Sequence, residues 1–185
     1  MTRTGYALAT MLTAGSFTGL FVAVTVVGPT PRFLWNASAS APIGLYRLHR
    51  SDPPVIGQLV AALPPAHLGR WMAERHYLPL GVPLLKHVAA GPGQRICRTG
   101  LAISIDGRPV VRARSHDSHG RPLPVWQGCR KLAQDQVLLL NPAVPDSLDG
   151  RYFSALPASV LLGRAAPILT RDAPNAPLIW RGIGS

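Results

Sequence analysis

The chain has 185 residues, enough for one domain with its own hydrophobic core. Hydrophobic residues make up 47% of it and charged residues only 15%, which excludes a disordered tail and a coiled coil, while 19 prolines and 18 glycines exclude a mostly helical bundle. The net charge of +11 allows an approach to anionic lipid or nucleic acid but does not define the fold.

Residues 6–28 form a stretch of 23 residues without a charge. As a helix it would be about 34 Å long, enough to cross a bilayer. A cleaved signal peptide and a buried helix of a soluble domain are the alternatives. The first small-x-small site, at Ala37 to Ala39, lies nine residues beyond Gly28, too far for typical signal cleavage. We therefore predict a retained membrane anchor over residues 1–30.

The charges beside this stretch leave its orientation open. Arg3 precedes it and Arg32 follows it, with further arginines beyond, and long domains can cross regardless of charge. The two cysteines, Cys97 and Cys129, are 32 positions apart, and one even pair in an anchored domain favours a disulfide in an oxidising compartment. Two unpaired buried thiols are the alternative, and a zinc site is disfavoured because neither cysteine belongs to a Cys-x-x-Cys motif.

After the anchor, the sequence predicts a mainly β fold without internal repeats. A short helix is expected over 67–75, a hairpin turn at Asp106-Gly107 and a polar loop over 116–124. We predict one domain over 31–170 and an irregular tail over 171–185. The expected strands cover 44–49, 58–63, 83–90, 95–97, 101–105, 109–111, 136–140 and 160–169.

The first motif that suggests chemistry is the run NASASAPIGLY at 36–46. Small residues flank Ser38 and Ser40, which leaves a nucleophilic serine accessible. Taken alone, the run also fits a Ser/Ala linker that leaves the membrane.

The second motif is LLKHVAAGPG at 84–93, which places Lys86 inside an apolar strand. Burial lowers the pKa of an amine and makes it a usable general base. The alternative is a lysine whose stem packs while its ammonium reaches water. Only Lys86 and Lys131 are lysines, and the other 17 basic residues are arginines, which stay protonated.

The third motif is SLDGRYF at 147–153, after the predicted strand 136–140. It contains Ser147, Asp149 and Arg151. Alone, it could be an Asp-Gly turn with a surface ion pair.

In this order and spacing, the three motifs and the strand QLVAALP at 58–64 resemble the signal peptidase I superfamily, peptidase family S26. The closest resemblance is to its TraF branch, the conjugative-transfer signal peptidases that mature pilin, and it covers about residues 5–170. The resemblance implies the signal-peptidase (LexA/signal peptidase) β-fold with an N-terminal transmembrane helix. His87, Gln94 and Gly150 depart from the general signal peptidase pattern and favour the TraF branch.

The resemblance also implies roles. Ser40 would be the nucleophile and Lys86 its general base, with the Ser40 backbone N–H and the Ser38 hydroxyl forming the oxyanion hole. Ser147 would orient Lys86, and Asp149 and Arg151 would form a supporting ion pair. The chemistry needs no cofactor and no metal.

The expected partners are a pilin-like precursor polypeptide, the inner membrane and components of a type IV secretion system. The catalytic domain would lie on the periplasmic side of a bacterial inner membrane, and cleavage could be coupled to cyclisation of the pilin. Nucleic-acid binding is not expected, because the arginines are scattered and no binding motif is present. The alternative function is a non-catalytic assembly or scaffold subunit of a conjugation channel.

Overall fold

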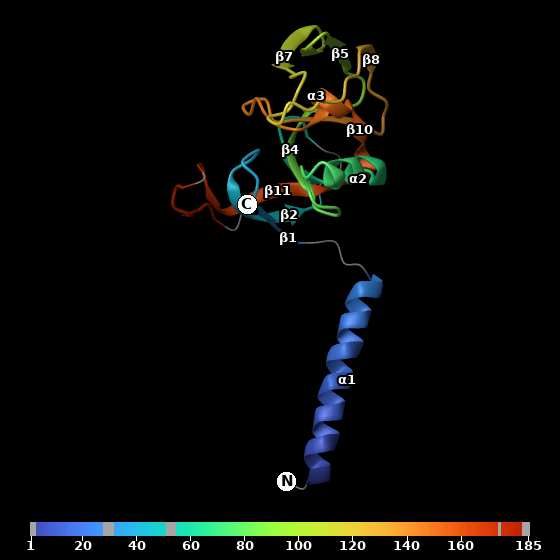
Figure 1. Ribbon diagram of the computed structural model, residues 1–185, viewed down its shortest axis with the longest axis vertical. Coiled ribbons are helices and arrows are strands. Elements are labelled where there is room, and N and C mark those ends of the chain that lie inside the picture. Colours follow the sequence, from blue (N-terminus) through green and yellow to red (C-terminus); the bar gives the residue numbers. More distant parts are fainter. Residues whose placement is uncertain (1–2, 28–31, 51–54, 174, 183–185) are drawn as a thin grey trace. The chain divides into compact units, whose positions relative to one another are not determined.

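The computed structural model describes residues 3–27, 32–50, 55–173 and 175–182 (Figure 1). It divides the chain into two compact units, Met1–Pro31 and Arg32–Ser185. The first unit carries one helix, and the second carries two antiparallel sheets with short helices. The predicted mainly β fold with an N-terminal apolar helix is confirmed.

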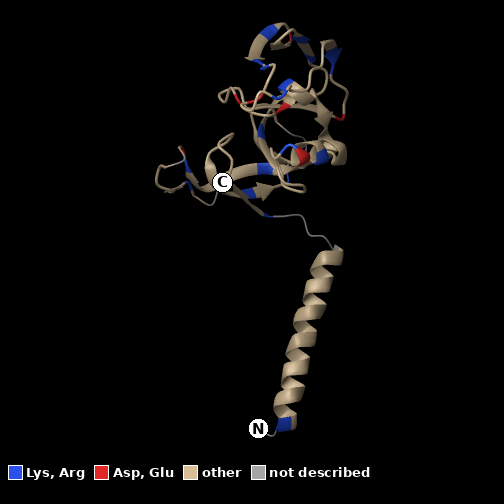
Figure 2. Cartoon of the chain, viewed as in Figure 1, with Lys and Arg blue, Asp and Glu red and all other residues tan. Residues whose placement is uncertain are grey.

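The helix α1 (Arg3–Val27) is long and apolar enough to cross a membrane. Arg3 is its only charged residue, and Figure 2 shows blue only at the amino end of this helix. Four hydroxyls inside it, those of Thr10, Thr13, Ser16 and Thr25, donate to carbonyls of the same helix; for example, Thr10 Oγ1 donates to Tyr6 O at 2.9 Å and Ser16 Oγ to Leu12 O at 2.8 Å. Because these groups are satisfied within the helix, they are compatible with a hydrocarbon surrounding.

The larger sheet of the second unit has the strand order β1-β2-β11-β3-β4-β9-β10, and β12 pairs with β11. All of its pairings are antiparallel. Its strands are β1 (Phe33–Asn36), β2 (Ile43–His49), β3 (Leu59–Ala62), β4 (Leu84–Ala90), β9 (Gln136–Leu140), β10 (Leu156–Pro157), β11 (Leu161–Arg171) and β12 (Ile179–Trp180).

The smaller sheet has the order β7-β6-β5-β8 and lies at the opposite end of this unit from β1 and β2 (Figure 1). Its strands are β5 (Arg95–Thr99), β6 (Ala102–Ile105), β7 (Arg108–Arg112) and β8 (Gly128–Lys131). The predicted turn at Asp106-Gly107 joins β6 to β7, and both residues have positive φ, as a tight hairpin requires.

Among the described residues, three helical segments complete the unit: α2 (Ala66–Glu74), α3 (Gly150–Phe153) and the 3₁₀ turn Ala158–Val160. The helix α2 agrees with the predicted helix within one residue at each end. The sequence analysis missed β1, β8, β10 and α3, because each is short and lacks an apolar alternation. The tail predicted as irregular contains the short strand β12.

The core surrounds the middle of the larger sheet, where β4 lies between β3 and β9. Val60, Val88 and Leu139 belong to one buried cluster, while Ala61 and Leu85 belong to another. The alternation of side chains along paired strands separates the two clusters onto opposite faces. Lys86, in the middle of β4, therefore lies among apolar side chains.

Candidate active site

The loop between β1 and β2 carries both candidate serines, and the Asn36 side chain fixes its shape. Asn36 Nδ2 donates to the carbonyls of Ser38 at 2.9 Å, Ala41 at 3.0 Å and Pro42 at 3.1 Å. Its Oδ1 accepts from the Ser38 backbone N–H at 3.2 Å and from the Ser38 hydroxyl at 3.0 Å. One buried amide thus orders the whole turn around Ser40.

Two further residues of the same motif support this loop from β2. Tyr46 Oη donates to Pro42 O at 2.6 Å, and burial raises the pKa of Tyr46 to about 12, so this donor keeps its proton. Gly44 has φ +147°, and a Cβ there would lie 2.0 Å from Leu169 O of β11. The glycine therefore lets β2 approach β11 closely at the exit of the loop.

Ser38 and Ser40 face each other within this loop. Their hydroxyl oxygens are 3.0 Å apart and share a hydrogen bond, while Ser38 Oγ also donates to Asn36 Oδ1. Because the Ser38 proton is used on Asn36, the Ser40 hydroxyl is the donor of the pair. Ser40 is half-buried and Ser38 is exposed, so solvent reaches both hydroxyls.

Lys86 lies in the middle of β4 with only 2% of its surface exposed. It pairs in register with Val60 of β3, so its side chain leaves the sheet on the same face as Val60 and Val88. The snorkelling alternative is wrong, because the ammonium does not reach solvent. Burial, the largest effect, lowers the pKa of Lys86 from 10.5 to about 8, and nearby Asp149 raises it in part.

The Lys86 amine donates to Ser147 Oγ at 2.7 Å, and Ser147 is itself 2% exposed. Ser147 follows β9 in the turn 141–149 and reaches Lys86 across 61 positions of sequence. This contact holds the end of the lysine side chain inside the fold. Within the described part of the chain, the Ser40 hydroxyl bonds to Ser38 rather than to the Lys86 amine.

Asp149 and Arg151 form a buried ion pair, with side chains 0% and 1% exposed. Arg151 Nε and Nη2 each lie 2.9 Å from a different Asp149 oxygen, and the surface-pair alternative is therefore wrong. Arg151 also donates to the carbonyls of Asn141 and Val144, both at 2.8 Å. The pair thus closes the turn that carries Ser147.

Gly150 lies between Asp149 and Arg151 and departs from the general motif described above. The structure explains why a glycine stands at this position. A Cβ at this position would meet the Leu139 carbonyl oxygen at 2.9 Å and the Leu138 side chain at 2.6 Å. A serine there would therefore require a shift of α3 away from β9.

Asn141 is the site residue that sequence reasoning missed. It follows β9 directly and is 3% exposed. Its side chain contacts the Ser40 carbonyl at 2.5 Å and the Leu85 carbonyl at 3.0 Å, from segments 101 and 56 positions away. The only signal in the sequence was an amide at the end of a continuous apolar run, which belongs to no motif.

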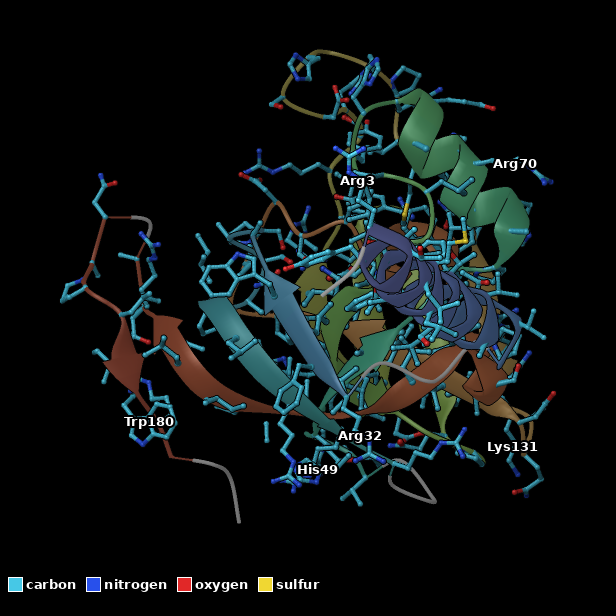
Figure 3. All side chains as sticks on the ribbon, turned by 90° about the horizontal axis from the view of Figure 1, so that it is seen from below. Arg3, Arg32, His49, Arg70, Lys131 and Trp180 are labelled. Atoms are coloured by element: carbon cyan, nitrogen blue, oxygen red, sulfur yellow. A yellow bond between two sulfur atoms is a disulfide. The ribbon has the colours of Figure 1, made fainter. Side chains whose placement is uncertain are left out.

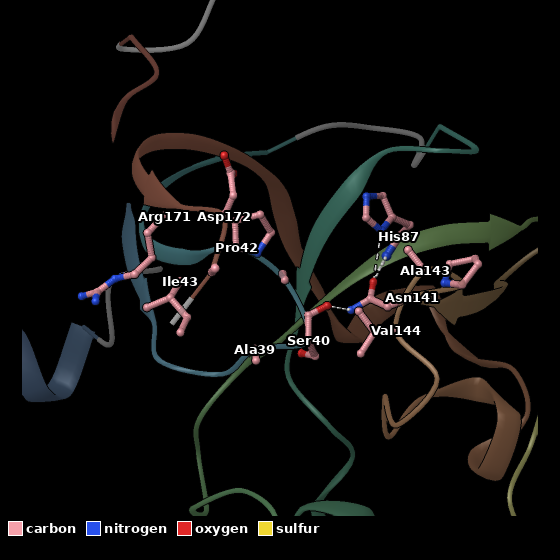
Figure 4. Close-up of a pocket in the computed structure, with 13 residues that line it drawn as sticks. Ala39, Ser40, Pro42, Ile43, His87, Asn141, Ala143, Val144, Arg171 and Asp172 are labelled. Atoms are coloured by element: carbon pink, nitrogen blue, oxygen red, sulfur yellow. Dashed lines mark hydrogen bonds between the residues drawn. The ribbon is translucent and has the colours of Figure 1, made fainter. Parts of the chain in front are cut away.

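A cavity of about 360 Å³ opens beside Ser40 (Figure 4). Residues 39–43 line one side, His87 and the segment 141–144 another, and Arg171 to Ala173 a third. A second cavity of about 840 Å³ shares His87, Pro142 and Ala143 with it and extends to β6 and β7. Mostly apolar surface therefore continues from the serine past His87.

The remaining candidates lie away from these groups. Cys97 and Cys129 are cross-strand neighbours on β5 and β8 and form the predicted disulfide. Lys131, the other lysine, is exposed at the end of β8 and projects outward in Figure 3. The structure thus brings together Ser38 and Ser40 in one loop, and Lys86, Ser147, Asp149 and Arg151 in a buried group beside it.

The chain is similar to known proteins over most of its length. Residues 3–170 match the family described as "Signal peptidase, peptidase S26". The probable conjugal transfer protein TraF of Sinorhizobium fredii is 36% identical over 145 residues, which cover 73% of this chain and 76% of the relative. The conjugal transfer protein TraF of Agrobacterium fabrum is 36% identical over 160 residues, which cover 80% of this chain and 88% of the relative.

Among solved structures, a signal peptidase I from Enterococcus faecalis aligns with a TM-score of 0.37 at 15% identity, over 63% of this chain and 98% of that one. The family match and the TraF relatives confirm the resemblance that the motifs indicated.

Proposed function

The chain belongs to the signal peptidase family, peptidase S26, and we propose that it is a membrane-anchored serine endopeptidase in which Ser40 and Lys86 form the catalytic dyad. The observation that carries the proposal is the state of Lys86. It is a buried amine whose pKa is lowered to about 8, and its strand is joined to the Ser40 loop through Asn141. Such an amine is partly neutral near physiological pH and can accept a proton.

In the proposed reaction, the Ser40 hydroxyl first leaves Ser38 and turns towards the Lys86 amine. Neutral Lys86 accepts the Ser40 proton while the serine oxygen attacks the scissile carbonyl carbon. The lysine then gives this proton to the departing amine as the C–N bond breaks, which leaves an ester on Ser40. A water molecule, deprotonated by the same lysine, hydrolyses the ester and releases the acid.

The oxyanion of the tetrahedral intermediate needs hydrogen-bond donors. We assign this role to the Ser40 backbone N–H and the Ser38 hydroxyl, which would exchange its bond to Asn36 for the oxyanion. The rigid turn around Asn36 supports this assignment, because preorganised donors contribute most. Losing one such donor lowers the rate by about 10²–10³-fold.

The proposed substrate is an exported precursor polypeptide, in the first place the pilin precursor of a conjugative transfer system. The names of the TraF relatives link them to conjugal transfer. The apolar surface on both sides of His87 suits an extended chain with small or apolar side chains. We place the catalytic unit on the periplasmic side of the inner membrane, because a disulfide requires an oxidising compartment.

The direct test is cleavage of a tagged conjugative pilin precursor when it is co-expressed with the full-length chain in a bacterial host. Ser40→Ala and Lys86→Ala should each abolish the shorter product. Ser118→Ala and Lys131→Ala, which remove the same groups from exposed positions, should leave it unchanged. Cleavage that persists in both site variants would exclude the dyad, and a product that also forms in the host without the chain would leave the non-catalytic scaffold as the function.

Mass spectrometry of the product separates hydrolysis from cyclisation. A linear product contains the added water, whereas a cyclic product is lighter by one water molecule. The ester on Ser40 is common to both outcomes, so either product is compatible with the dyad.

The pH dependence gives a second test. Below the pKa of Lys86, about 8, the neutral fraction of the amine falls about tenfold per pH unit, and the cleavage rate should fall with it. The rate should level off above this pKa. The cleavage rate of the purified chain is measured in detergent between roughly pH 6 and 9, the range in which a pKa near 8 is visible. A rate that does not change with pH in this range would contradict a lysine base.

A further inference from the structure

Every hydrogen-bonding group of the Asn141 side chain binds a segment that carries Ser40 or Lys86, the two residues of the proposed dyad. Its Nδ2 donates to the carbonyl of Ser40 at 2.5 Å and to the carbonyl of Leu85 at 3.0 Å. Figure 4 shows the first of these bonds, between the serine loop and the segment after β9. One nitrogen atom therefore joins the backbone of the nucleophile to the strand of the base.

The carbonyl group of the same side chain acts on the other side of Lys86. Asn141 Oδ1 accepts from the backbone N–H of His87 at 3.3 Å and lies 3.0 Å from His87 Nδ1. Because an amide oxygen only accepts, the His87 ring carries its proton on Nδ1 in this contact. The amide thus binds the backbone both before and after Lys86.

The backbone of Asn141 is fixed in turn by the buried ion pair. Its N–H donates to Asp149 Oδ2 at 3.0 Å, and its carbonyl accepts from Arg151 Nη2 at 2.8 Å. In the described residues, Asp149 and Arg151 have no hydrogen bond to Ser40 or Lys86. Their geometric influence on the dyad therefore passes through Asn141 and Ser147.

We propose that Asn141 is a positioning residue that sets the distance and orientation of Ser40 relative to Lys86. This inference rests on the proposed function, since it assumes that these two residues react. An asparagine suits the position because it offers two N–H donors to two carbonyls and one acceptor to β4. An aspartate would turn lone pairs towards the Ser40 and Leu85 carbonyls, and a leucine would leave both carbonyls without a donor.

The experiment compares Asn141→Asp and Asn141→Leu with Asn175→Leu, which makes the same change at an exposed asparagine. The purified full-length chains are assayed in detergent on a conjugative pilin precursor, with the concentration of folded enzyme determined by circular dichroism. Loss of alignment should lower kcat about 100-fold, since a misplacement of about 1 Å costs that much, while KM changes less than about threefold. Asn175→Leu should keep both constants.

Hydrogen exchange adds a readout that global destabilisation would not reproduce. In the Asn141 variants, amides over 37–43 should exchange faster, while those of α2 (Ala66–Glu74) keep their rate. Should Asn141→Leu not fold, Asn141→Ser takes its place, because a smaller polar side chain fits the same space.

The outcomes separate the two hypotheses. If Ser40→Ala and Lys86→Ala abolish cleavage but folded Asn141 variants retain the wild-type kcat, the positioning role is wrong and the dyad stands. If Ser40→Ala and Lys86→Ala still cleave, the proposed function itself has failed. Faster exchange at every segment, in α2 as well as in the loop, would reduce Asn141 to a general stabilising residue and overturn the inference.

Discussion

The two lysines of the chain lie on strands that differ in sequence character and in position: β4 is largely apolar, whereas β8 is exposed along its length. Lys86 lies on β4, an inner strand paired on both sides, and only 2% of its surface is exposed. Lys131 lies on β8, an edge strand whose four residues are all exposed. Burial lowers the pKa of Lys86 to about 8. The place of a strand in its sheet therefore decides whether a lysine is a solvated charge or a candidate base.

The largest expected difference between the two strands comes from replacing each lysine with arginine. Arginine stays protonated at any pH a protein tolerates, so Lys86→Arg should lower kcat by about 10⁴-fold. Lys131→Arg should leave it within about twofold, because a solvated charge is exchanged for another. Cleavage kinetics of the purified chains measure both, and a Lys86→Arg variant with near-normal kcat would remove the distinction between the strands.

A second contrast concerns two aspartates of the same turn. Asp149 is buried in its ion pair, whereas Asp146 pairs with Arg114 at the surface, with side chains 71% and 54% exposed. Asp149→Asn should lower the free energy of unfolding by about 3–5 kcal/mol, since it leaves a buried guanidinium without its counter-charge. Asp146→Asn should cost less than about 1 kcal/mol. Urea unfolding at pH 7 compares them, and equal losses would contradict the burial argument.

Removal of the disulfide tests whether the smaller sheet stabilises the fold without taking part in catalysis. Replacing Cys97 and Cys129 together by alanine should lower the free energy of unfolding by roughly 3–4 kcal/mol, from the entropy of a loop closed across 32 positions. At a temperature where the variant is still folded, kcat should be unchanged, because neither cysteine contacts the dyad. A fall in kcat of folded protein would show that the two sheets are coupled.

The smallest expected effect is the cost that burial of Lys86 imposes on the fold. Between pH 8 and 10.5, the unfolded chain binds more protons at Lys86 than the folded chain, so stability should rise with pH in this window. Below pH 8 the full penalty applies, about 3 kcal/mol for a shift of this size. Lys86→Met should remove the slope and stabilise the chain at pH 7 by about 2 kcal/mol, after the loss of the Ser147 contact.

Urea unfolding at several pH values measures this slope, with Lys131→Met as the control that should retain it. A wild-type slope equal to that of Lys86→Met would mean that the buried amine titrates at its ordinary pKa.

Most strands could be predicted because their apolar alternation is local. The strands β2, β3, β4, β9 and β11 follow runs that the sequence displays directly, and each agrees with its prediction within about two residues. The strand β8 could not be predicted, because Gly128 to Lys131 has no buried side chain and is a strand only through its pairing with β5. The short strand β1 likewise depends on β2.

The residues of the candidate site likewise divide into those that the sequence predicts and those that it does not. The sequence motifs pointed to Ser40, Lys86 and Ser147, because each lies in a run with recognisable order and spacing. They did not point to Asn141, whose partners Ser40 and Leu85 are 101 and 56 positions away. The role of Asn36 was also hidden, although it stands in the quoted motif, because its contacts depend on the shape of the turn.

The amino-acid order alone determined the apolar N-terminal helix, most of the strands, the pairing partners available to two cysteines and the family. Tertiary packing decided that Lys86 is buried, that Asp149 forms its ion pair in the interior and that the Asn141 amide joins the serine loop to β4. The reason is physical: periodicity and spacing belong to neighbours along the chain, whereas desolvation and hydrogen bonding depend on atoms that only the packed sheets bring within a few ångströms.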